Sequence, residues 1–185
     1  MKTGVARRAA TQSVRAKLLH RLSWYWQVEA ANVLLMPLIM VVLSKAKLGP
    51  LAALAIAAMS GMLVVGTIYL RSKYRQVAFG EPLDRALKFV AAAQVPMLAG
   101  CLLALGTMVW GWLQPGTTHG RAERWVITAA AVLAALEYIN YYHRQLQHFD
   151  NADDWRRLLS GRGFRKSQLR RDLERAGLRP GGPGS

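Results

Sequence analysis

The sequence predicts an all-α integral membrane protein, a bundle of four transmembrane helices with both termini in the cytoplasm. Hydrophobic residues make up 52% of the 185 residues and gather in four blocks. Blocks of about 18 or more mostly apolar residues are typical of membrane-spanning helices. Charged residues form only 19% of the chain and lie almost entirely between and outside these blocks. An ordinary soluble domain is therefore excluded.

Residues 1–23 form a basic N-terminal segment. We expect the first ten residues to be disordered, and a helix capped by Thr11 or Ser13 to follow. This helix is amphipathic, with leucines opposite arginines and lysines, which is typical of helices that lie on a membrane surface. Its end, 24–26, is the aromatic run Trp-Tyr-Trp, which marks the headgroup level. The sequence thus predicts an interfacial helix before the first span.

A four-helix transmembrane domain is predicted over residues 24–149. Ala53, Ala57 and Gly61 repeat every four residues in the second span, which favours close packing within the bundle. A basic loop, 71–88, follows this span, and Gly80 is expected to end the helix inside it. The fourth helix is predicted to continue beyond the membrane to about residue 149. The predicted spans are about 24–44, 50–70, 88–113 and 125–142.

Residues 150–177 are predicted to be a basic cytoplasmic tail of two short helices, and residues 178–185 a disordered end. The second helix is expected to begin at Ser167 and to stop at Gly177. Basic side chains in the tail suit anionic lipid headgroups or a partner protein. A nucleic-acid partner is disfavoured because the tail lacks aromatic interleaving and a recognisable fingerprint. The predicted contact residues are Arg156, Arg157, Arg162, Arg165, Lys166, Arg170 and Arg171.

The distribution of the 25 Lys and Arg residues predicts the orientation. The N-terminal segment carries 6, the middle loop 5 and the chain from Arg144 onward 10, whereas the first and third loops carry 2 each. Cytoplasmic loops collect Lys and Arg. Both termini and the middle loop are therefore expected in the cytoplasm, and the protein in the inner (plasma) membrane or an internal membrane.

Polar side chains enter the cytoplasmic half of the spans. At about 1.5 Å per residue, Glu29 lies about 7 Å, Gln94 about 9 Å and Glu137 about 10 Å below the headgroups. Buried polar groups in hydrocarbon require partners or water. We therefore predict one intramembrane polar cluster with two arginines at its rim. Its members are Glu29, Asn32, Gln94, Glu137, Asn140, Tyr141, Arg71 and Arg144.

This cluster has two interpretations. In the structural one, Arg71, Arg144 or another buried donor neutralises the carboxylates, and the hydrogen bonds only fix the packing of the helices. In the functional one, Glu29 and Glu137 hold a cation, a proton or a polar headgroup. The sequence has no HExxH spacing, and His143 and His148 do not share a helix face, so no metal site or cofactor is predicted.

Three functions are compatible with these features. The favoured one is a non-enzymatic accessory, assembly or scaffold component that contacts lipids and a membrane-protein partner or a second copy. The first alternative is a small transporter or channel subunit that uses Glu29 and Glu137. The second is a lipid-modifying enzyme with Glu137, Tyr141 and His143 or His148 near the headgroups. The absence of GxSxG, P-loop and dinucleotide-binding motifs argues against known catalytic chemistry.

Overall fold

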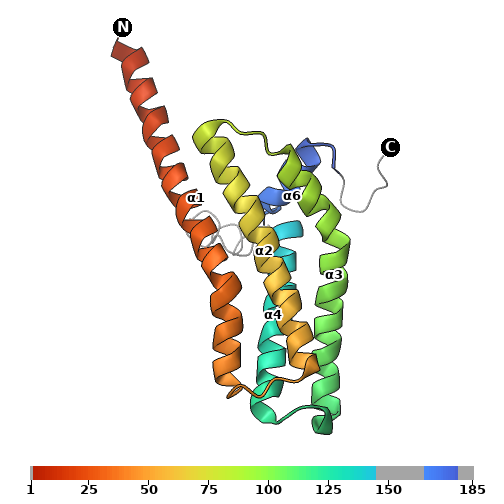
Figure 1. Cartoon of the computed structure of the whole chain (residues 1–185). Coiled ribbons are helices and arrows are strands. Elements are labelled where there is room, and N and C mark those ends of the chain that lie inside the picture. The colour runs from red at the N-terminus through yellow and green to blue at the C-terminus, as the bar shows by residue number, and fades with distance from the viewer. Residues whose placement is uncertain (1, 145–164, 179–185) are drawn as a thin grey trace, which may run out of the picture.

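The structure is a computed structural model that describes residues 2–144 and 165–178, with side chains from residue 15 onward. Every element in these ranges is helical. The elements are α1 (Lys2–Leu43), α2 (Pro50–Phe79), α3 (Asp84–Leu113), the short 3-10 helix η1 (Pro115–Thr117), α4 (Arg121–Tyr142) and α6 (Gln168–Arg175). The four long helices run alternately up and down, and α6 lies at the end where α2 finishes and α3 begins (Figure 1).

Three helices are long and apolar enough to cross a membrane. They are the Arg15–Leu43 part of α1, all of α2 and all of α3. Large apolar side chains on their outer faces are exposed, as lipid contact requires, including Leu34 at 78% and Val95 at 66%. The fourth long helix, α4, is more polar, because Glu137 and Asn140 interrupt its second half.

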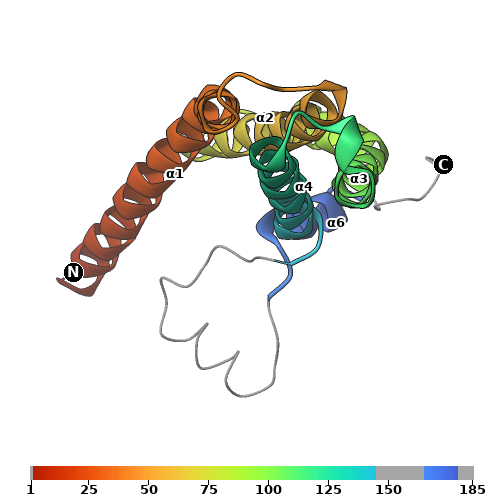
Figure 2. The ribbon, with the colours of Figure 1, turned by 90° about the horizontal axis from the view of Figure 1, so that it is seen from below.

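The core lies between α2, α3 and α4, and α1 packs along the outside of α2 with few contacts to α4 (Figure 2). Small residues allow α2 and α4 to approach closely: Ala52 and Ala55 of α2 and Ala130 and Ala134 of α4 are fully buried. The predicted small-residue stripe is wrong in register, because Ala53 and Ala57 are exposed.

The N-terminal segment also differs from its prediction. Residues 2–10 are helical rather than disordered, and α1 continues without a break through the aromatic run at 24–26. Alanine-rich sequence propagates a helix readily once it is nucleated. The amphipathic stretch therefore extends the first span and is not a separate helix. Its N-terminal part projects beyond the other helices (Figure 1).

Two helix ends lie elsewhere than predicted. The second helix continues through most of the predicted basic loop to Phe79, and Gly80 ends it at φ 74°, a left-handed conformation that suits glycine. Conversely, α4 ends at Tyr142 and does not reach residue 149. The chain leaves the helix because the His143 carbonyl accepts a hydrogen bond from the Ser167 N–H, and Arg144 pairs with Lys166 as a β-bridge. The first predicted tail helix lies outside the described residues.

Candidate functional site

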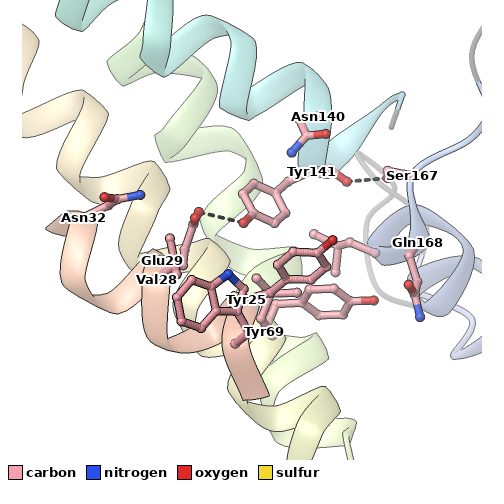
Figure 3. Close-up of a pocket in the computed structure, with 12 residues that line it drawn as sticks. Tyr25, Val28, Glu29, Asn32, Tyr69, Asn140, Tyr141, Ser167 and Gln168 are labelled. Carbon is pink, nitrogen blue, oxygen red and sulfur yellow. Dashed lines mark hydrogen bonds between the residues drawn. The ribbon is translucent and has the colours of Figure 1, made fainter. Parts of the chain in front are cut away.

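A partly open cavity of about 290 Å³ lies between α1 and α4 at the α6 end of the bundle. Four helices line it, and α2 forms its floor while α6 closes one side (Figure 3). Its polar lining comes from side chains that are far apart in the sequence. The lining residues are Trp24, Tyr25, Val28, Glu29, Asn32, Tyr69, Leu70, Asn140, Tyr141, Ser167, Gln168 and Leu169.

Glu29 is the charged centre of the cavity. It is 8% exposed, and its Oε1 accepts a hydrogen bond of 2.7 Å from the Tyr141 hydroxyl. No other hydrogen bond and no ion pair to Glu29 is formed by the residues that the structure describes. Gly66 of α2 makes room for this pair, because a Cβ there would stand 2.7 Å from Glu29 Oε1 and closer still to the Tyr141 hydroxyl.

A second carboxylate supports the same negative centre. Glu137 lies one helical turn before Tyr141 on α4 and interacts electrostatically with Glu29. Its Oε2 accepts a hydrogen bond of 3.4 Å from the Asn140 amide. The i, i+3 and i+4 spacing of Glu137, Asn140 and Tyr141 puts all three on one face of α4. Glu137 itself is not among the residues that line the cavity, and its pairing with Glu29 stays a prediction.

The wall on the α6 side is held by one polar and one apolar set of contacts. The Ser167 hydroxyl caps α6 by accepting from the Arg170 N–H at 3.1 Å, and it donates to the Tyr141 carbonyl. The predicted start at Ser167 and stop at Gly177, where φ is 71°, are confirmed. Leu169 and Leu173 are each 1% exposed, so α6 buries an apolar face against the bundle.

Asp172 fastens α6 to α2. Its Oδ2 accepts hydrogen bonds from the Tyr69 hydroxyl at 2.9 Å and from Lys73 Nζ at 2.8 Å. The side chains of Lys73 and Asp172 are 16% and 8% exposed, so this ion pair is largely shielded from solvent. Removal of one partner from such a buried ion pair strongly destabilises the fold, because the other charge remains buried and uncompensated.

The structure brings only part of the predicted cluster together. Glu29, Asn32, Asn140 and Tyr141 line the cavity. Gln94 does not: it is buried beside Tyr138, and its amide oxygen has no hydrogen-bond partner in the part of the chain described here.

The described contacts of the two rim arginines do not include Glu29. The Arg71 guanidinium lies 5.6 Å from the centre of the Trp26 ring, and the Arg144 main chain forms the bridge with Lys166. The described hydrogen-bond partner of Glu29 is the Tyr141 hydroxyl. Neutralisation of Glu137 by an arginine or another buried donor stays a prediction.

Only some of the residues predicted to contact lipid or a partner lie in the described ranges. Arg165, Lys166 and Arg171 are exposed at the end of the bundle where α6 lies, and Lys166 and Arg170 form ion pairs with Glu174 at 3.1 and 3.0 Å. Arg156, Arg157, Arg162 and His148 lie outside the described ranges. The His143 ring lies 5.5 Å from the Tyr138 ring.

Several site residues have no strong sequence signal. Tyr69 and Asp172 are 103 positions apart, and nothing in either local pattern indicates that they meet. Gly66 is one of 16 glycines. The one available signal is the amphipathic pattern of residues 168–175, which predicts a buried leucine face but not the helix that receives it.

A further buried carboxylate, also not predicted, organises the opposite end. Glu123, 2% exposed, lies just before the predicted fourth span and accepts hydrogen bonds from the Gly49 N–H at 2.5 Å, the His119 N–H at 2.5 Å and His119 Nδ1 at 3.0 Å. Burial raises the pKa of this carboxyl, but the bonds from His119 and Gly49 outweigh burial and hold the pKa below its ordinary value. Glu123 thereby joins the α1–α2 and α3–α4 connections.

Comparison with known proteins gives no relative from which a role could be transferred. A scan against models of protein families and searches of curated proteins and of solved structures found no match to this chain. Within residues 2–144 and 165–178, no group of three or more His, Cys, Asp or Glu side chains is placed to hold a metal ion. The geometry of the cavity is therefore the basis for a functional proposal.

Proposed function

We propose that the protein is a small non-enzymatic membrane protein that binds a cation in the α1–α4 cavity, as a small transporter or channel subunit would. The observation that carries this proposal is the environment of Glu29. Its carboxyl is buried, faces a cavity, and receives one neutral hydrogen bond rather than an ion pair. An uncompensated buried charge is very costly, so such a carboxyl must take up a proton or a cation.

The neighbouring Glu137 strengthens this argument. Two carboxyls that interact electrostatically cannot both ionise without a counter-ion, because each opposes the charge of the other. Two basic residues near the end of α2 have other described partners: Arg71 lies over Trp26, and Lys73 pairs with Asp172.

The proposal includes a membrane arrangement. We place α4 across the membrane as the fourth span, with both termini, the α2–α3 connection and α6 in the cytoplasm, in the inner membrane. The excess of Lys and Arg in these segments supports this sidedness. The exposed basic side chains around α6 would then meet anionic lipid headgroups.

The test is to measure cation and proton flux in vesicles that contain the purified protein, together with cation binding in detergent. Glu29→Gln and Glu137→Gln should each reduce flux and binding at least tenfold while the protein remains monodisperse. The matched control is Glu174→Gln, which removes one carboxylate from the exposed side of α6. Equal flux and binding in wild type and in Glu29→Gln would reject the proposal.

A second candidate, an accessory component of a membrane complex, is favoured by the projecting end of α1. No other element packs around this end in the described part of the chain (Figure 1). A basic helix that extends past its own bundle is suited to contact a partner. Deletion of residues 2–14 should then abolish crosslinking to a co-purifying membrane protein but leave cation binding intact. If the deletion leaves the crosslinked species unchanged, this role is wrong.

A further inference from the structure

The aromatic lining of the cavity indicates what kind of cation it takes. Four aromatic side chains contribute to the lining: Trp24, Tyr25, Tyr69 and Tyr141. Figure 3 shows the rings of Tyr25, Tyr69 and Tyr141 close together beside Glu29.

The tyrosine hydroxyls are occupied by other contacts. Tyr69 donates to Asp172 and Tyr141 donates to Glu29, while the Tyr25 hydroxyl accepts from Arg21 at 3.1 Å. These residues therefore contribute mainly ring surface to the lining, although Arg21 lies over the Tyr25 ring at 5.6 Å. An aromatic face attracts a cation within about 6 Å of the ring centre, and recognition of ammonium groups uses such aromatic surfaces.

Hard metal ions are disfavoured by the same lining. Mg²⁺ and Ca²⁺ need about six oxygen ligands, several of them carboxylate or carbonyl. Among the described residues that line the cavity, Glu29 is the only acidic one, and the aromatic rings cannot replace the lost water ligands. An ammonium group is more weakly hydrated than Mg²⁺ or Ca²⁺. One carboxylate together with aromatic rings around the cation is enough to bind it.

In the proposed membrane arrangement, the cavity lies at the level of the lipid headgroups. Its α1 residues begin at the aromatic run 24–26, which marks the headgroup level, and Glu29 is about 7 Å deeper. Basic side chains surround the same end: Arg21 stacks on Tyr25 at 5.6 Å, and Arg71 stacks on Trp26 at 5.6 Å. A zwitterionic headgroup would place its ammonium beside Glu29 and its phosphate toward these cations.

We infer that the cavity binds an ammonium group, carried by a phospholipid headgroup or by a soluble amine, between the Glu29 carboxylate and the rings of Tyr25, Tyr69 and Tyr141. This inference rests on the proposed cation-binding function and names the class of its ligand. The rings select ammonium over an inorganic ion of equal charge, and Glu29 supplies the counter-charge.

The first experiment uses the full chain in nanodiscs of phosphatidylglycerol, a lipid without an amine. Calorimetric titration with tetramethylammonium chloride should give binding at least tenfold tighter than with NaCl or KCl. Glu29→Gln and Tyr25→Leu should each weaken tetramethylammonium binding at least tenfold, and Tyr25→Phe, which keeps the ring, should restore most of it. Trp125→Leu, which removes an exposed aromatic ring at the opposite end, and Glu174→Gln should have no effect.

The second experiment separates the two sources of the ammonium group. Phosphatidylethanolamine or phosphatidylcholine in the nanodisc should compete with tetramethylammonium if a lipid is the ligand, and native mass spectrometry should detect the retained lipid. Absence of competition assigns the site to a soluble amine. Equal affinity for Na⁺, K⁺ and tetramethylammonium, with no loss in Tyr25→Leu, overturns the inference but leaves the cation site. Wild-type protein whose cation binding and flux are the same as those of Glu29→Gln overturns both.

Discussion

At the scale of single residues, the cavity depends on the absence of a Cβ at one glycine as well as on the side chains that line it. Gly66 lies on α2 directly under the contact between Glu29 and Tyr141, where a methyl group would overlap both. Glycine weakens a helix interior by about 0.5–1 kcal/mol relative to alanine, so its presence here is explained by the space it leaves.

Gly66→Ala should therefore destabilise the protein despite its better helix propensity. We expect a loss of about 1–3 kcal/mol, the usual cost of overpacking, and a displaced Tyr141. The midpoint of thermal unfolding in detergent should fall by several degrees. Gly100→Ala is the matched control, because its Cβ would meet only Ala58 Cβ at an ordinary 3.7 Å. A Gly66→Ala midpoint at or above that of Gly100→Ala would refute this account.

Glu123 allows a prediction about pH. Its folded-state pKa is below the ordinary value, so the unfolded chain binds more protons as pH falls, and stability is lost from about pH 4.5 down through the folded-state pKa. Glu123→Gln should lower the free energy of unfolding by about 1.5–3 kcal/mol at pH 7, which is the usual contribution of hydrogen bonds to a charged group. The gap between wild type and Glu123→Gln in unfolding midpoint should narrow as pH falls below 4.5. A gap that stays constant to pH 3.5 would contradict this.

The residue scale also shows what could be predicted of the site. Glu29, Asn32, Asn140 and Tyr141 are recognisable because polar side chains in apolar helices are rare, and their depth follows from the helical rise. Gln94 has the same signature but points toward Tyr138, since depth does not determine on which side of a helix a residue lies. The direction in which a residue faces around the helix axis depends on helix packing, which the sequence does not reveal.

At the scale of elements, α6 is a short helix that tertiary contacts must hold. Eight residues are too few for a stable isolated helix, so its order depends on the buried leucines and on Asp172. Because Ser167, Gln168 and Leu169 also line the cavity, the contact between Asp172 and Lys73 couples the order of α6 to the shape of the cavity.

Asp172→Asn should release α6. The amide keeps the shape of Asp172 but leaves the Lys73 ammonium without its counter-charge. Hydrogen exchange of the backbone amides of residues 168–175 should accelerate at least tenfold, equivalent to about 1.4 kcal/mol. Glu174→Gln on the same helix removes the same charge from an exposed pair and should leave exchange nearly unchanged. Equal exchange rates in the two variants would show that Asp172 does not hold α6.

The helix ends illustrate the limits of local sequence signals. The sequence predicts helix stops at Gly80 and Gly177 because neither residue has a Cβ that opposes a left-handed conformation. It predicts a loop for the basic stretch before Gly80 because Lys and Arg collect outside the membrane. Yet a helix continues easily from membrane into water, so the membrane boundary and the helix end are separate features. The end of α4 at Tyr142 depends on residues 166 and 167, which no local pattern near residue 142 contains.

At the scale of the whole molecule, composition and block length predict an all-helical protein with four spans. The described residues confirm the all-helical class and three helices apolar enough to cross a membrane, and the crossing of α4 stays a prediction. The packing order does not follow from the same signals. The structure places α1 against α2 with few contacts to α4, and this leaves the cavity between α1 and α4. A tightly closed four-helix arrangement would have filled that space with side chains.

Sidedness and the crossing of α4 make one testable prediction for the whole molecule. In a Cys101→Ser background, which removes the only cysteine, single cysteines replace exposed Arg85, Gln114 and Arg175. A membrane-impermeant maleimide added to intact cells should label Gln114→Cys, at the α3–α4 connection. The other two variants should be labelled only after permeabilisation, because positive charge retains their segments in the cytoplasm. Labelling of Arg175→Cys together with Gln114→Cys in intact cells would mean that α4 does not cross. Labelling of Arg85→Cys but not Gln114→Cys would mean the opposite orientation, and the cavity would then face the outside of the cell.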